Sequence, residues 1–112
     1  MRLKVKKNAH EQKYSESMHP EIQIGNEYEV IGIDSKYFRI ICDDGEPVLY
    51  EKEIFDIIDP TIPNNWVKVG GEDEYALSPP ELSTKYFFEE YFDGKKNVIQ
   101  IFEKYVNSMS IK

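Results

Sequence analysis

The hydrophobic periodicity of the chain changes near residue 78, and this change constrains the fold more than any other feature. From Ile22 to Asp59, short runs of β-branched and aromatic residues are broken by turn formers roughly every eight positions, which is typical of a compact antiparallel meander. Beyond residue 78, apolar residues recur at helical spacing instead. Strands followed by helices predict an α+β domain.

Three strands are predicted within the meander, at residues 27–33, 37–42 and 47–50. The link between the first two has hairpin length, and the Asp44-Gly45 pair before the third supplies the positive φ angles that a tight hairpin turn demands. Further along, we expect one helical turn over 51–55, extended chain at 57–58 and a last hairpin over 66–77.

Apolar residues occupy both faces of the first two predicted strands. In the first strand, strict alternation places on opposite faces two sets of residues: Tyr28, Val30 and Gly32, and Glu29, Ile31 and Ile33. Because both faces then need cover, the sheet must close into a small barrel or carry a helix across its second face.

Two C-terminal helices are predicted. Ser78, followed by two prolines and Glu81, matches a capping box, so the first helix should span 79–92 and end before Gly94. The second should span 96–107, with one buried face made of Val98, Ile99, Ile101, Phe102, Tyr105 and Val106.

Residues 1–21 form a polar, basic, partly ordered lead-in, and residues 22–112 form a single globular domain with its sheet over 27–77. The Leu3-x-Val5 alternation could add an edge strand. Five basic residues and one acidic residue fall within the first thirteen positions, although the whole chain carries a net charge of -7. A frayed, solvated terminus is the simplest interpretation of this segment.

The acidic balance argues against a nucleic-acid ligand, because phosphate binding needs clustered Lys and Arg, and it favours a basic protein partner. No apolar run is long enough for a secretion signal or a membrane span, and Cys42 is the single cysteine, which excludes an internal disulfide. We expect a cytoplasmic protein that does not bind membranes.

No catalytic apparatus is visible in the sequence. Both histidines precede residue 20, so neither a metal site nor a nucleophile with a histidine base is expected in the body of the chain, and Cys42 is interpreted as a small buried hydrophobe. Gly70-Gly71 is followed by acidic residues that would repel a phosphate. The sequence therefore predicts a protein that is not an enzyme and needs no cofactor.

The aromatic run of residues 86–92 is the most unusual segment. Either its helix is buried on two sides, or one or two rings stay exposed as anchors for a partner. Acidic residues flank it, and helix packing could bring them into one surface. We hypothesise that the partner-binding residues are Glu72, Asp73, Glu74, Glu89, Glu90 and Asp93.

Several strings resemble a group of small bacterial proteins: residues 28–34, 37–40, 44–47, 55–59 and 65–67, followed by 78–82 and 88–93. The similarity covers roughly residues 25–106. Members of the group look like Src-homology-3-like barrel proteins, some of which are the immunity partners of polymorphic toxins. The resemblance implies a strongly bent antiparallel sheet or such a barrel, followed by two C-terminal helices, and no catalytic residues.

Together these observations favour a non-catalytic, immunity-like interaction protein that binds and neutralises a basic toxin, such as a nuclease. The alternative is a barrel-type peptide-binding or scaffold module. Its groove would be lined by Tyr28, Tyr37, Tyr50 or Trp66. A small enzyme that uses carboxylates which the sequence does not single out is a third hypothesis.

Overall fold

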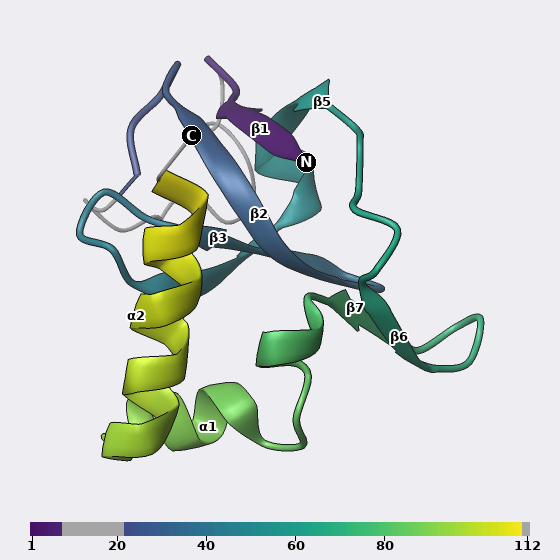
Figure 1. Cartoon of the computed structure of the whole chain (residues 1–112). Coiled ribbons are helices and arrows are strands. Elements are labelled where there is room, and N and C mark those ends of the chain that lie inside the picture. Colours follow the sequence, from purple (N-terminus) through teal and green to yellow (C-terminus); the bar gives the residue numbers. More distant parts are fainter. Residues whose placement is uncertain (8–21, 111–112) are drawn as a thin grey trace.

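The computed structural model describes residues 1–7 and 22–110. It has the α+β arrangement that the sequence predicts: an antiparallel sheet of seven strands, followed by two C-terminal helices (Figure 1). The sheet is bent but it does not close into a barrel. The strands are β1 Arg2–Val5, β2 Glu27–Asp34, β3 Tyr37–Ile41, β4 Pro47–Glu51, β5 Phe55–Asp59, β6 Val67–Gly70 and β7 Tyr75–Ser78. The helices are α1 Phe87–Phe92 and α2 Lys96–Ser110, with short 3-10 turns η3 Lys52–Ile54 and η4 Pro80–Leu82.

The long strand β2 organises the sheet. On one side it pairs with β3, which in turn pairs with β4. On its other side its first half pairs with β1 and its end pairs with β7, so β1 and β5 diverge from β7 and β6 along one strand (Figure 1). One edge of β2 is therefore shared between two partner strands.

β1 is an inner strand, contrary to the expectation that residues 1–21 precede the globular domain. It lies between β2 and β5, and the side chains of Leu3 and Val5 are 0% and 1% exposed. The sequence pattern indicated at most an edge strand here, because the two apolar residues alternate with Arg2 and Lys4. The rest of the predicted lead-in, residues 8–21, lies outside the described residues.

A β-bulge at Ile31 corrects the predicted alternation along β2. The pairing with β3 runs from Val30 opposite Ile40 to Gly32 opposite Arg39, so the register shifts by one residue. Such a shift moves the following side chains to the other face of the sheet. Ile33 therefore joins Tyr28 and Val30 in one core, whereas Ile31 faces a second core.

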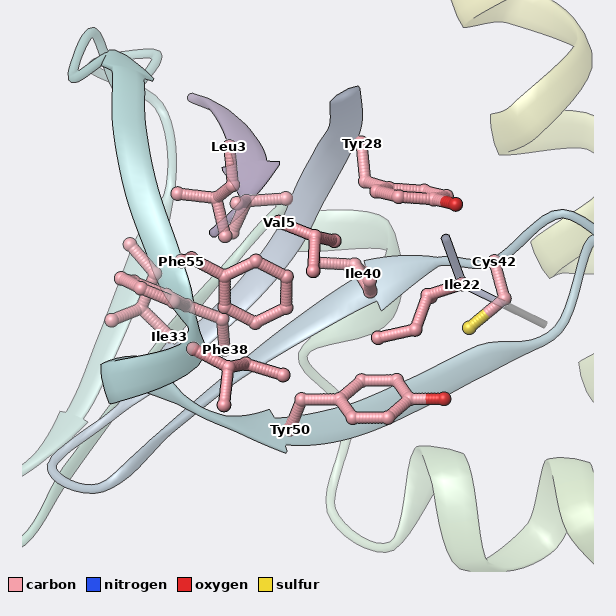
Figure 2. Packing of buried hydrophobic residues seen from close by; sticks show 12 residues of the cluster. Leu3, Val5, Ile22, Tyr28, Ile33, Phe38, Ile40, Cys42, Tyr50 and Phe55 are labelled. Atoms are coloured by element: carbon pink, nitrogen blue, oxygen red, sulfur yellow. The ribbon is translucent and has the colours of Figure 1, made fainter. Parts of the chain in front are cut away.

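The first core lies within the bend of the sheet (Figure 2). Leu3 and Val5 of β1 meet Phe38 and Ile40 of β3 there, and Phe55 packs edge-on to Phe38 with ring centroids 6.2 Å apart. The second core lies between the outer face of the sheet and the helices, and it contains Ile31, Leu82, Phe87, Val98 and Phe102. The bend and the helices thus cover one face each.

The helix predicted over 79–92 is interrupted, and the capping role of Ser78 is wrong. Ser78 ends β7 and pairs with Val67, while η4 begins after Pro79 without a side-chain cap. Four residues separate η4 from α1, because Tyr86 has a left-handed backbone (φ 64°) that cannot continue a helix.

The end of α1 and the start of α2 follow the sequence prediction. Gly94 has φ 85°, its N–H donates to the Tyr91 carbonyl (3.1 Å), and the Lys95 N–H donates to the Glu90 carbonyl (3.1 Å). These two bonds form a Schellman motif, which ends α1. In α2 the predicted buried face is correct for Val98 and Phe102, but Ile101 is 42% exposed.

Candidate functional site

A groove runs between the sheet and the segment from η4 to α1. Its volume is about 260 Å³. The sheet contributes residues of β2, β3, β4, β6 and β7, and the other wall comes from the η4–α1 segment. We call this feature the sheet–α1 groove and describe it by six of its lining residues: Arg39, Leu49, Val69, Leu82, Tyr86 and Phe88.

Arg39 is the only cation among the described residues that line the groove. It lies in a row with Gly32 and Leu49, its register partners on β2 and β4. A Cβ at Gly32 would lie 3.3 Å from the Arg39 Cβ, so the glycine leaves room for the arginine side chain. Sequence and register therefore place a guanidinium on a sheet face that otherwise packs against aromatic rings.

The guanidinium of Arg39 is half-buried and held by two contacts. Its Cζ lies 3.9 Å from the centroid of the Phe88 ring, and its Nη1 donates to the Pro47 carbonyl at 2.8 Å. Burial lowers the pKa of Arg39 to about 10, and the nearby charges of Glu89 and Asp34 oppose this shift. In the described part of the chain no carboxylate lies within the 4.0 Å of an ion pair with Arg39. The arginine remains cationic at neutral pH.

Tyr86 forms an exposed, strained corner of the groove. Its φ of 64° makes it the one non-glycine residue with positive φ in the described ranges, and its side chain is 59% exposed. A left-handed backbone costs a residue with a Cβ about 1–2 kcal/mol. The adjacent Phe87 is 3% exposed in the second core, and the Phe87 N–H donates to the Thr84 carbonyl (3.1 Å). Packing of Phe87 therefore holds Tyr86 in this conformation.

Helix α1, which carries Phe88, is fastened to the sheet by Tyr91. The Tyr91 hydroxyl donates to Glu46 Oε2 at 3.0 Å, in the turn between β3 and β4. Burial, together with the carboxylate of Glu46, raises the pKa of Tyr91 to about 12. The Tyr91 ring also packs edge-on against Phe102 of α2, with centroids 5.0 Å apart. The α1 wall of the groove is thus anchored at both the sheet and α2.

Exposed side chains line the groove together with Arg39. Leu49 of β4 is 40% exposed and Val69 of β6 is 57% exposed, and both line the groove together with Tyr86. The sequence suggested either that the helix of the aromatic run is buried on two sides or that one or two of its rings stay exposed, and the structure combines the two. Phe87 is buried and Phe88 and Tyr91 are half-buried, whereas Tyr86 and Phe92 remain exposed.

The acidic residues singled out in the sequence do not form one surface. Glu72, Asp73 and Glu74 lie in the turn between β6 and β7, which points away from α1 in Figure 1. Glu89 lines the groove. Glu90 forms an ion pair with Lys95 (2.9 Å), and Asp93 is the C-cap of α1. The break between η4 and α1 separates the two stretches that a continuous helix was expected to bring together.

Of the aromatic residues expected to line the alternative groove, Tyr28 and Tyr50 are buried, and Tyr37 and Trp66 are half-buried. Tyr28 and Tyr50 are 4% and 3% exposed in the first core, where the ring of Tyr50 extends toward Cys42 (Figure 2). The Tyr28 hydroxyl donates to Asp43 Oδ2 (3.0 Å) and accepts from the Gln23 N–H (2.9 Å). Trp66 is half-buried against the same core. These three rings support the fold, whereas Arg39 and Leu49 of the sheet–α1 groove lie on the other face of the sheet.

Cys42 is a buried free thiol, and burial raises its pKa to about 11, which disfavours the reactive thiolate. Within residues 1–7 and 22–110, no three His, Cys, Asp or Glu side chains gather closely enough to hold a metal ion. None of the helices in these ranges is long and apolar enough to cross a bilayer.

Sequence reasoning missed Arg39 and Tyr86. A signal for Arg39 was available, because it is a charged residue at the centre of the otherwise apolar strand Tyr37–Ile41. No comparable signal marks the conformation of Tyr86, which depends on packing between the sheet and helices.

Comparison of the chain with protein-family models, with curated proteins and with solved structures finds no match.

Proposed function

We propose that this protein is a non-catalytic interaction protein that binds a protein partner through the sheet–α1 groove. The observation that carries the proposal is a single groove lined by the exposed residues Leu49, Val69 and Tyr86 together with the half-buried guanidinium of Arg39. Tyrosine and arginine are enriched among residues that dominate binding energy at interfaces. Grouped apolar residues on an otherwise charged surface mark interaction sites.

The chemistry of the groove suits recognition. A permanent cation, aromatic rings and aliphatic side chains supply orientation and apolar contact. The backbone strain at Tyr86 also supports a binding role, because strained conformations concentrate at ligand-binding and other functional sites. A reducing compartment such as the cytoplasm suits a chain whose single thiol is free and buried.

A second candidate function is the immunity type, in which acidic surfaces bind and neutralise a basic toxin. It is favoured by the exposure of Glu72, Asp73, Glu74, Glu89 and Asp93, for which the described residues supply no ion-pair partner. The net charge of -7 would attract such a partner over a long range. In this case the two acidic stretches would contact the toxin at two separate places.

Affinity capture from the cells that make the protein, followed by direct binding measurements with the purified partner, tests both candidates. The proposed function predicts that Tyr86→Ala weakens binding about tenfold or more. Ile58→Ala, which changes an exposed apolar residue on β5, is the matched control and should have no effect. If Tyr86→Ala has no effect while Glu72→Lys with Asp73→Lys slows association, the groove is not the site and the immunity-type surface is favoured.

A further inference from the structure

The guanidinium of Arg39 has unused hydrogen-bonding capacity inside the groove. Its N–H groups form a planar fork that matches a carboxylate. In the described residues, one bond to the Pro47 carbonyl accounts for its hydrogen bonding, and the Phe88 ring contacts its face. From these contacts, and resting on the proposed function, we propose that the groove binds a partner segment in which an apolar side chain lies next to a carboxylate that pairs with Arg39.

The charge distribution selects a carboxylate over a phosphate. Phosphorylated segments are recognised by clusters of arginines. Arg39 is the only cation in the lining, and Asp34 and Glu89 line the same groove. A phosphate, with about -1.5 to -2 charge at neutral pH, would be repelled by these two acids more strongly than a singly charged carboxylate. The lowered pKa of Arg39 agrees with a guanidinium that burial has left incompletely compensated.

The apolar part of the ligand follows from the side chains around Arg39. Leu49 and Val69 extend from the sheet, Tyr86 stands at the start of α1, and all three are exposed. The groove volume of about 260 Å³ lies below the roughly 300–1,000 Å³ of pockets that enclose small molecules. It therefore suits one or two side chains of a peptide segment, with the carboxylate of an Asp or a Glu beside them.

The test uses a displayed library of random linear peptides selected on the full chain. Peptides that lose binding to Tyr86→Ala are synthesised in matched pairs, with Asp or Glu replaced by Asn or Gln. On wild-type protein, we expect each amide peptide to bind about tenfold or more weakly than the acid peptide of its pair. On the Arg39→Gln variant, we expect the acid and amide peptides to bind equally well. Lys68→Gln, a change of an exposed lysine outside the groove, should preserve the preference for the acid.

The outcomes separate the two proposals. Groove-dependent peptides that bind equally as acid and amide overturn the carboxylate inference and leave the proposed function intact. Tighter binding of a phosphoserine version than of the aspartate version also overturns it. If no selected peptide depends on Tyr86, both proposals fail. Concentration-dependent dimerisation that Tyr86→Ala abolishes would assign the groove to a second copy of the chain and overturn the inference. Should Arg39→Gln fail to fold, the acid and amide peptides on wild-type protein still decide the question.

Discussion

The strained backbone of Tyr86 leads to a prediction that separates an effect on stability from an effect on binding. Tyr86→Gly removes the side chain and permits the left-handed conformation, whereas Tyr86→Ala removes the same ring but keeps a Cβ at φ 64°. Both variants lose the hydroxyl, the ring and the contact of the ring with Lys85, whose Nζ lies 5.1 Å from the ring centroid. The difference in unfolding free energy between them therefore reports the conformational preference of the backbone at residue 86.

The magnitude follows from two opposing effects. The left-handed conformation costs a residue with a Cβ about 1–2 kcal/mol. Glycine offsets part of this gain, because it gives the unfolded chain about 0.4–1 kcal/mol more conformational entropy than alanine does. With the middle of each range, we therefore expect Tyr86→Gly to be more stable than Tyr86→Ala by about 0.8 kcal/mol. Gly94→Ala is the matched control, since its φ of 85° with no atom near a new Cβ predicts destabilisation by strain alone.

The assay is urea unfolding followed by the fluorescence of Trp66, the single tryptophan, in parallel with binding of a groove-dependent peptide. Both Tyr86 variants should lose peptide binding to a similar degree, although the glycine variant is the more stable of the two. An alanine variant as stable as the glycine variant would show that residue 86 is not strained, and the argument from strain to function would be lost.

Three further predictions concern the fold. Leu3→Ala should destabilise the protein by about 2–5 kcal/mol in urea unfolding, because Leu3 is fully buried. Lys4→Ala, which changes an exposed residue of the same strand, should have an effect near zero. An equally small effect of Leu3→Ala would contradict the inner position of β1. Ser78→Ala should change the unfolding free energy by less than about 0.5 kcal/mol, since Ser78 caps no helix, and a cost of 1 kcal/mol or more would restore the capping box. Raising the pH from 9 to 11 should lower the free energy of unfolding, because the thiol ionises near 9.0 in the unfolded chain, whereas burial raises the pKa of folded Cys42 to about 11. The contribution of the protonated thiol to stability is therefore fully present below pH 9. In a pH series of unfolding curves, Cys42→Ala should show a shallower decline than the wild-type protein.

The sequence alone determined the order and type of most elements. The turn at Asp44-Gly45 was predicted in part: Gly45 adopts φ 85° and its N–H donates to the Cys42 carbonyl (2.9 Å), whereas Asp44 does not adopt the positive φ that the predicted turn required. The Schellman motif at Gly94 and the apolar spacing of α2 are local properties. Apolar residues on both faces of β2 were enough to predict that a second layer must cover the sheet.

Only the tertiary structure decided where the groove lies. The bulge at Ile31 arises from pairing with β3 and determines which core each side chain enters. The inner position of β1 depends on two partners that are distant in sequence. The left-handed Tyr86 is held by burial of Phe87 and anchorage of Tyr91, against its own backbone preference. Local sequence signals reflect conformational preferences of about 1 kcal/mol per residue, whereas burial of a large side chain contributes about 1.5–3 kcal/mol. Long-range packing therefore overrides the local preferences where the groove forms.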